Sequence, residues 1–126
     1  MGKESKFSRE VVDYLKAKGA LVNVNTATIY DRVGRSDIEA CYEGHYIALE
    51  LKTGNYAPDP LQITYLQQVR DAGGYGLLLR DTLYDLIELL NYLDNWDEVD
   101  YVEPELPEIN YEELEVYYDW RISERY

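Results

Sequence analysis

The sequence predicts an α/β fold in which a mixed sheet is flanked by helices. Segments with helical apolar spacing and short apolar runs follow one another in the order helix, three strands, helix, strand, helix. Two neighbouring strands are separated only by a turn, which indicates an antiparallel pair, whereas the last strand follows a helix, which indicates a parallel crossover. The chain has 126 residues, enough for one domain with a real core.

The first half of this pattern contains one helix and three strands. Residues 5–18 have apolar side chains at helical spacing, and Gly19 is a fitting end for this helix. Strands are expected over residues 20–30 (with or without a bend), 37–42 and 46–52. The last two flank Glu43-Gly44-His45, a plausible hairpin turn.

The second half has clear boundary signals. Asp59 is a good N-cap and Pro60 a good first residue for a helix that runs to about Ala72 and ends at Gly73-Gly74. Residues 75–80 are expected to form a buried strand. A final helix, capped by Asp81 or Thr82, is expected to run to about Leu93.

Charge divides the chain into two expected parts, a domain over residues 1–93 and an acidic, aromatic-rich extension over residues 94–126. Residues 1–90 contain 13 acidic and 10 basic side chains, a net charge of −3, whereas residues 91–126 contain 12 and 2, a net charge of −10. An acidic field does not attract phosphate, which argues against a nucleic-acid partner. For residues 94–126 three hypotheses remain: a folded extension, favoured by its aromatic content, an inhibitor in a DNA groove, or a docking surface for a basic protein.

The composition also narrows the location and the metal chemistry. No apolar run is long enough to span a membrane or to act as a secretion signal, so the cytoplasm is the expected location. Cys41 is the single cysteine and His45 the single histidine, which excludes an intramolecular disulfide and a cysteine-based zinc cluster. Any metal would need oxygen ligands, as Mg²⁺, Mn²⁺ and Ca²⁺ do.

The strand over residues 46–52 points to a site. Alternation places Ile47, Leu49 and Leu51 on one face, and Glu50 and Lys52 on the other. The hairpin brings Asp37, at the start of its partner strand, close to Glu50. Two carboxylates in one site repel each other unless a cation lies between them, so a Mg²⁺ ion is expected here.

Three further groups are expected near the carboxylates. Glu10 comes from the first helix, on or near its inward face, and Gln62 lies in the first turn of the next helix. Lys52 would orient or deprotonate an attacking water, or stabilise charge on a transferring phosphorus. A Glu/Lys pair on a half-exposed strand often does no more than face the solvent. The prediction of an active site therefore depends on the other residues expected near Glu50 and Lys52.

The ordered set of these residues resembles a known pattern. Gly34-Arg35-Ser36-Asp37, then Glu50-Leu51-Lys52, then Gln62 resemble the PD-(D/E)XK nuclease superfamily, and within it the VRR-NUC domains, which are small and often phage-encoded. The resemblance covers roughly residues 5–90. It implies a restriction-endonuclease-like αβββαβ core and an Mg²⁺- or Mn²⁺-dependent DNA endonuclease, in the host cytoplasm if phage-encoded.

The resemblance also implies roles for individual residues. Asp37, Glu50 and the main-chain carbonyl of Leu51 would bind the ion, and Glu10 would assist, often through water. Lys52 would act on the nucleophilic water, with Gln62 positioning that water or Lys52. Stand-alone members resemble Holliday-junction resolvases, tend to be homodimers and cut branched DNA. Ser36 departs from the proline that often precedes the aspartate, and the acidic extension is not part of the pattern.

The sequence leaves two interpretations open for the roles of three residues that could bind DNA. It also leaves an alternative function open for the protein as a whole. Arg32 and Arg35 would hold a DNA phosphate or be solvated loop residues, and Tyr56 would stack on a base or be a surface aromatic. The alternative function is a nuclease-fold interaction module with a weak or idle metal site, whose acidic extension engages a protein partner. The complete Asp37, Glu50, Lys52 and Gln62 set argues against an idle site.

Overall fold

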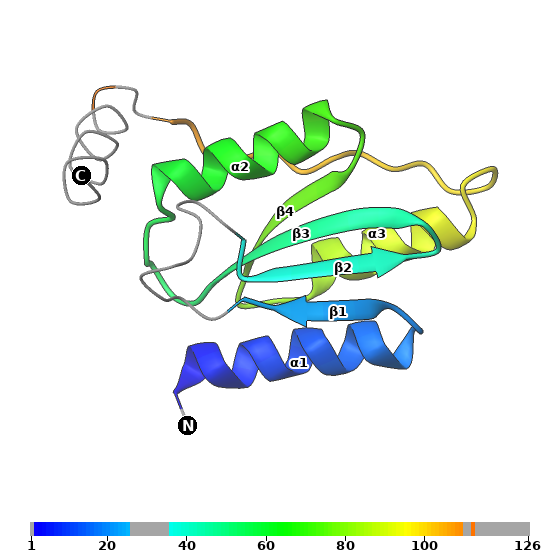
Figure 1. Cartoon of the computed structure of the whole chain (residues 1–126), viewed down its shortest axis with the longest axis horizontal. Helices are drawn as coiled ribbons and strands as arrows, with labels where there is room; N and C mark the ends of the chain where they lie inside the picture. The colour runs from blue at the N-terminus through cyan, green and yellow to red at the C-terminus, as the bar shows by residue number, and fades with distance from the viewer. Residues whose placement is uncertain (1, 26–35, 110–111, 113–126) are drawn as a thin grey trace.

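The computed structural model describes residues 2–25, 36–109 and 112, and it confirms the predicted fold and order of elements (Figure 1). The helices and strands are α1 (Lys3–Ala17), β1 (Leu21–Val24), β2 (Ile38–Tyr42), β3 (His45–Lys52), α2 (Pro60–Asp71), β4 (Tyr75–Arg80) and α3 (Tyr84–Asp94). The strands form one sheet in the order β1-β2-β3-β4. The pairs β1–β2 and β2–β3 are antiparallel and β3–β4 is parallel, as the mixed sheet requires.

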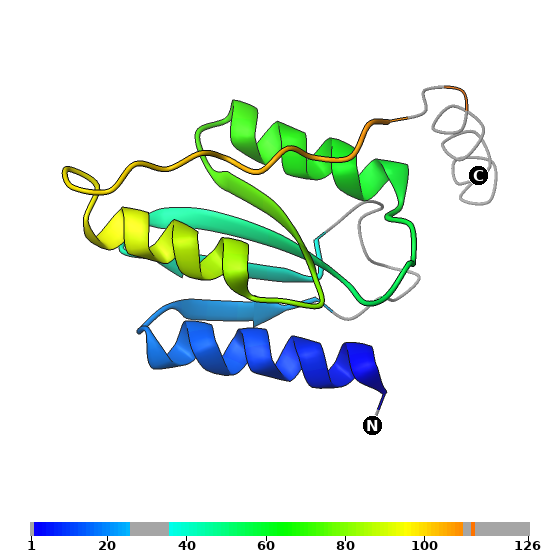
Figure 2. The same ribbon diagram turned by 180° about the vertical axis from the view of Figure 1, so that it is seen from behind.

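The two faces of the sheet differ in what covers them (Figures 1 and 2). The larger apolar cluster joins α1 and α3 to one face, to which β3 contributes Ile47, Leu49 and Leu51. On the other face α2 packs over Ala48 with a smaller cluster. Alternation along β3 therefore places Glu50 and Lys52 on the α2 face, as predicted.

A two-residue turn fixes how β2 pairs with β3. Glu43 and Gly44 both have positive φ, 48° and 83°, which is the requirement of a type I′ hairpin turn. The predicted turn also included His45, but His45 begins β3 and pairs with Tyr42. The ladder ends at the pair of Ile38 with Leu49, so the next position brings Asp37 opposite Glu50.

The other boundaries follow the predicted signals with two differences. The Asp59 carboxylate accepts a hydrogen bond from the Leu61 N–H (2.9 Å), so the predicted N-cap of α2 is confirmed. The strand predicted over residues 20–30 ends at Val24, and residues 26–30 lie outside the described part of the chain. The N-cap of α3 is Leu83 rather than Asp81 or Thr82: the Thr82 hydroxyl accepts from the Tyr84 N–H (3.2 Å) one position before the cap, and Asp81 binds the loop after β3.

Residues 101–109, which we call the C-terminal strap, pack on the body (Figure 2). The Tyr101 ring contacts Tyr75 and Tyr92 beside the larger cluster, and Leu106 and Ile109 pack into the α2 cluster. The strap thus passes from one layer to the other around β4, the edge strand, and covers an edge that would otherwise be open to pairing. Beyond Ile109, the extension predicted over residues 94–126 lies outside the described residues, apart from Glu112.

No helix in the described part of the chain is long and apolar enough to cross a membrane.

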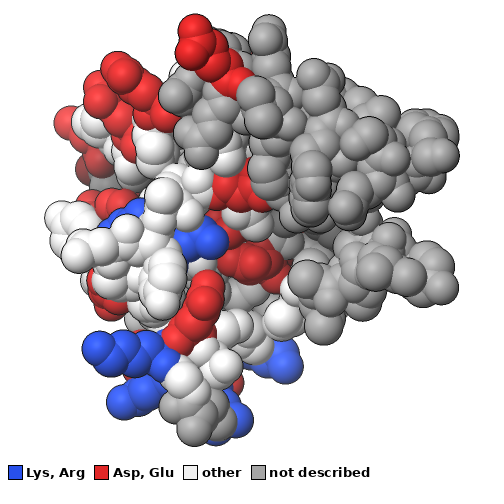
Figure 3. Space-filling view, turned by 90° about the vertical axis from the view of Figure 1, so that its left-hand side faces the viewer, with Lys and Arg blue, Asp and Glu red and all other residues white. Residues whose placement is uncertain are grey.

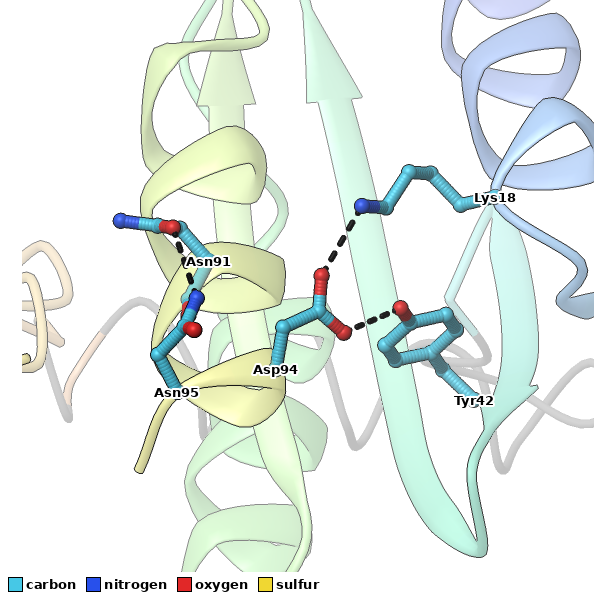
Figure 4. Close-up of polar contacts among 5 residues, drawn as sticks. All are labelled: Lys18, Tyr42, Asn91, Asp94 and Asn95. Carbon is cyan, nitrogen blue, oxygen red and sulfur yellow. Dashed lines mark hydrogen bonds and ion pairs between the residues drawn. The ribbon is translucent and has the colours of Figure 1, made fainter. Parts of the chain in front are cut away.

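A polar cluster ties α1, β2 and α3 together at the hairpin end of the sheet (Figure 4). The Asp94 carboxylate accepts hydrogen bonds from the Tyr42 hydroxyl and from Lys18 Nζ (2.9 Å for Lys18). These two bonds lower the pKa of Asp94, and the bond from Tyr42 has the larger effect. The same bond raises the pKa of the Tyr42 hydroxyl to about 12. Because Tyr42 is buried, its hydroxyl has few alternative partners.

We expect Asp94→Ala to lower the free energy of unfolding by about 1–3 kcal/mol, because it leaves the Tyr42 hydroxyl and Lys18 without their partner. Urea unfolding at pH 7 measures this change. Asp97→Ala is the matched control, since Asp97 is exposed in the turn that follows α3, and it should change the stability by less than about 0.5 kcal/mol. Equal effects of the two substitutions would contradict the assigned role.

Candidate active site

Asp37 is held at the start of β2 by both neighbouring strands. Asn25, directly after β1, donates its N–H to the Asp37 carbonyl and its side-chain amide to the Ser36 carbonyl, each at 2.8 Å. From the other side, the Leu51 N–H donates to Asp37 Oδ2 (2.9 Å). The backbone and the carboxylate of Asp37 are therefore both fixed, which is what a group that must bind a ligand in one geometry needs.

Glu50 is a buried carboxylate without a hydrogen-bond partner. The residue is 0% exposed, and neither carboxylate oxygen accepts a hydrogen bond within the described part of the chain. Burial, and next the charge of Asp37, raise the pKa of Glu50 to about 8, against the opposing effect of Lys52. Without a bound cation, Glu50 is therefore mostly protonated at pH 7.

Lys52 lies beside Glu50 and is positioned by the loop that follows it. Lys52 Nζ is 3.4 Å from Glu50 Oε1, and its side chain is 18% exposed, so the ammonium can also reach a ligand. The Asp81 carboxylate accepts from the Gly54 N–H (3.0 Å), and Arg80 donates to the Gly54 carbonyl (2.8 Å). Asp81 also donates its N–H to the Lys52 carbonyl (3.0 Å), so this clamp fixes the chain on both sides of Thr53.

A cavity of about 390 Å³ opens between the N-terminal part of α1 and this end of the sheet. Its lining residues are Glu4, Ser5, Ser8, Val24, Asn25, Asp37 and Leu51. Figure 3 looks onto this end of the molecule, where acidic side chains meet near the centre of the view. Asp37 and Leu51 therefore border a cavity that also reaches the first turns of α1, whereas Glu50 and Lys52 are not among its lining residues.

The acidic residue that α1 contributes to this cavity is Glu4. Glu4 and Ser8 are four residues apart and share one face of the helix. Glu10 follows Ser8 by two residues, about 200° around the helix, so it projects away from the cavity. Glu10 is exposed, and the prediction that it lies on or near the inward face of the helix is wrong.

The remaining predicted site residues within the described part of the chain do not line this cavity. Gln62 lies in the first turn of α2, partly buried, with its N–H bonded to the Asp59 carbonyl (2.9 Å). Tyr56 lies in the loop between β3 and α2 and is 73% exposed. Arg32 and Arg35 lie outside the described residues. Their DNA-binding roles stay predictions.

The carboxylates of Asp37 and Glu50 fit a divalent cation that prefers oxygen ligands. A cation would satisfy the two Glu50 oxygens that have no hydrogen-bond partner and would remove the repulsion between the carboxylates. The Leu51 N–H points to Asp37, and because N–H and C=O of one strand residue point to the same side, its carbonyl faces that side too.

The protein would supply only part of the coordination shell. Among the described residues, no group of three or more Asp, Glu, His or Cys side chains is arranged to hold a metal. Two carboxylates and a carbonyl, completed by water and substrate phosphate oxygens, are the usual share of a protein that binds Mg²⁺. The donor set is therefore suited to an ion that acts together with a phosphate substrate.

Comparison with known proteins supports the fold through structure rather than sequence. No protein-family model and no curated protein matches the chain. A solved structure of a VRR_NUC domain superimposes with a TM-score of 0.59 at 21% identity, over 73% of this chain and 98% of that domain. The chain has the fold of a VRR-NUC domain. The Holliday junction resolvase Hjc from Archaeoglobus fulgidus also matches, with a TM-score of 0.48 at 18% identity, over 60% of this chain and 66% of that one.

The VRR-NUC fold explains why Asp37 and Glu50 meet, but three supporting residues were not predicted. Asn25 is one of many polar residues near a strand end, and only the β1–β2 pairing shows that it binds the backbone beside Asp37. Glu4 was not predicted because its position relative to the site depends on how α1 packs against the sheet. Asp81 was expected to be a helix cap, and its φ of 61° shows instead that the chain turns there.

The protonation of Glu50 makes the stability of the metal-free protein depend on pH. The pKa of Glu50 is 4.5 as an ordinary carboxyl and about 8 in the fold, so between these values the folded chain binds a proton that the unfolded chain has released. The free energy of unfolding therefore falls as the pH rises through this range.

We expect this dependence to disappear in Glu50→Gln. Between pH 5.5 and pH 8, in EDTA, the wild-type protein should lose about 2–3 kcal/mol relative to the variant, since one pKa unit corresponds to about 1.4 kcal/mol. Urea unfolding at several pH values measures the difference. Glu88→Gln, an exposed position on α3, should keep the wild-type pH dependence. A parallel pH dependence in Glu50→Gln would contradict the raised pKa.

Proposed function

We propose that this protein is a divalent-metal-dependent nuclease that hydrolyses phosphodiester bonds in DNA. The observation that carries the proposal is the buried Glu50 carboxylate, which accepts no hydrogen bond from any described residue and lies opposite a fixed Asp37 and beside Lys52. A buried carboxylate next to a second, partly buried one is unfavourable for folding, so the presence of the two favours a function that uses the charge. The VRR-NUC fold supports the same class of reaction.

Asp37, Glu50 and the Leu51 carbonyl would hold Mg²⁺ or Mn²⁺ in this proposal. When bound, the ion polarises the scissile phosphate and lowers the pKa of water. Asp37 is held in place by the Leu51 N–H and by Asn25, so the ligand geometry exists before the substrate arrives. Glu50 must lose its proton for this role, which makes metal binding favourable at higher pH.

Lys52 would orient the attacking water and stabilise the negative charge that develops on the phosphate oxygens. Its ammonium is next to Glu50 and partly exposed, and the Asp81 clamp keeps its main chain in place. Gln62, at the start of α2, would position the water or Lys52. Water adds to phosphorus, the bond from phosphorus to the leaving oxygen breaks, and that oxygen takes up a proton.

For the substrate we propose a class of DNA structure, and for the assembly an oligomeric state. The proposed substrate class is branched DNA, such as a four-way junction. The pattern of Asp37, Glu50 and Lys52 resembles that of Holliday-junction resolvases, and this resemblance implies such a substrate. A homodimer follows from the same resemblance. Tyr56, exposed in the loop before α2, would stack on an unpaired base.

The direct test compares cleavage of a four-way junction, a splayed fork, linear duplex and single-stranded DNA in Mg²⁺, Mn²⁺ or EDTA. We expect metal-dependent cleavage, with Glu50→Gln and Lys52→Ala each slowing it at least about 100-fold, the usual loss when a charge-stabilising or proton-transfer group is removed. Glu88→Gln should cleave at the wild-type rate. No cleavage by the full-length protein with any substrate and metal would overturn the proposal.

Glu4 rather than Glu10 would assist the site from α1. We expect Glu4→Gln to lower the single-turnover cleavage rate by about 5–50-fold, because it removes an acidic group from the cavity wall beside Asp37. Glu10→Gln, on the same helix with the same chemical change, should have less than a twofold effect. The reverse order would show that α1 is turned differently about its axis in the active protein.

A further inference from the structure

The lysines and arginines of the described chain differ in whether they already have partners. Outside α1 all of them are engaged: Lys18 with Asp94, Lys52 with Glu50, Arg70 with Glu103 and Arg80 with the Gly54 carbonyl. Four exposed side chains make no ion pair or hydrogen bond within the described residues: Lys3, Lys6, Arg9 and Lys16. Among the described residues, the cations that remain available for a ligand are therefore gathered on one helix.

Three of these four cations lie in the turns of α1 that border the cavity: Arg9 lies four residues after Ser5 and on its side of the helix, whereas Lys3 and Lys6 project from the outer side. Lys3, Lys6 and Arg9 belong to the same turns of α1 as Glu4, Ser5 and Ser8, which line the cavity. In Figure 3 lysine and arginine side chains gather over α1, at the bottom of the view, below the acidic centre. Residues 3–9 carry three basic and one acidic side chain, in a protein whose net charge is −13.

The side of the molecule that α2 covers is acidic. The strap packs along α2 and carries Glu103, Glu105 and Glu108, with no lysine or arginine. Arg70, the basic residue that faces it, is bound to Glu103 at 2.9 Å, and its side chain is 11% exposed. A polyanion is therefore repelled from the α2 side and attracted to the α1 side.

We propose that the N-terminal half of α1 is the surface that receives the sugar-phosphate backbone of DNA, with Lys3, Lys6 and Arg9 as its phosphate contacts. This inference rests on the proposed nuclease function, and it adds the side from which the DNA arm enters. The backbone lies across the first turns of α1, and one phosphate reaches the cavity between α1 and Asp37. The proposed surface also explains how a protein with an acidic net charge would bind DNA, because binding depends on a local cluster of cations rather than on the net field.

The test measures DNA binding by fluorescence anisotropy in EDTA, with a labelled four-way junction and a labelled duplex over a range of salt concentrations. The variant carries Lys3→Gln, Lys6→Gln and Arg9→Gln together. We expect its Kd at low salt to rise at least tenfold. The slope of log K against log[salt] should become shallower by about 2–3, since each phosphate contact contributes about 0.9.

Lys16→Gln is the matched control, because Lys16 lies on the same face of α1 as Arg9, seven residues or about 10 Å further from the cavity. It should change Kd less than twofold. Equal salt slopes in the wild-type protein and the triple variant, or an equal loss in Lys16→Gln, would overturn the proposal. Thermal unfolding verifies that the exposed substitutions leave the fold intact.

The two proposals fail in different ways. If the wild-type protein binds DNA through these residues but never cleaves it, the nuclease function is wrong and the binding surface stands. If it cleaves DNA and the triple variant binds and cleaves as the wild type does, the surface is wrong and the nuclease function stands. If the wild-type protein binds no DNA at low salt, the binding surface is wrong whatever the cleavage assay shows.

Discussion

The pairing of β2 with β3 is the constraint on which the rest of the structure depends. A two-residue turn with positive φ at both positions fixes the register, and a shift by one residue would turn every side chain of one strand to the other face. The same register that buries Ile47 and Leu49 brings Asp37 opposite Glu50. The core and the site are therefore specified together, and the site has a carboxylate buried where an apolar residue would be more favourable for folding.

The two faces of the sheet carry different parts of the core and of the site. The α1 and α3 face carries the larger apolar cluster, tied at its far end by Asp94. The α2 face carries Glu50 and Lys52, supported by side-chain contacts from Asn25 and Asp81 at the edges of the site. Charge is separated as well, because within the described ranges the lysines and arginines without an ion pair lie on α1, and the acidic strap lies on α2. This division gives an acidic protein one flank to which a polyanion is attracted.

Much of this arrangement could be predicted because its signals are local. The alternation along β3, the Glu43-Gly44 turn and the Asp59-Pro60 helix start each depend on a few neighbouring residues, and together they predicted the meeting of Asp37 with Glu50. The apolar stripe of α1 showed which face is buried, but not which turns of the helix border the cavity, so Glu10 was named for the site and Glu4, which lines the cavity, was not. That choice depends on how the helix crosses the sheet. The path of the strap depends on contacts of Tyr101 with residues far apart in the sequence, which composition alone could only suggest.

The central claim is that Glu50 and Asp37 form a cation site that releases a proton when it fills. Calorimetric titration of Mn²⁺ into the protein at pH 7, in two buffers with different heats of ionisation, tests this most directly. Because the pKa of Glu50 is about 8, binding should release nearly one proton per ion, and both binding and release should be lost in Glu50→Gln and Asp37→Asn. Binding without proton release, or binding that both variants retain, would contradict the account.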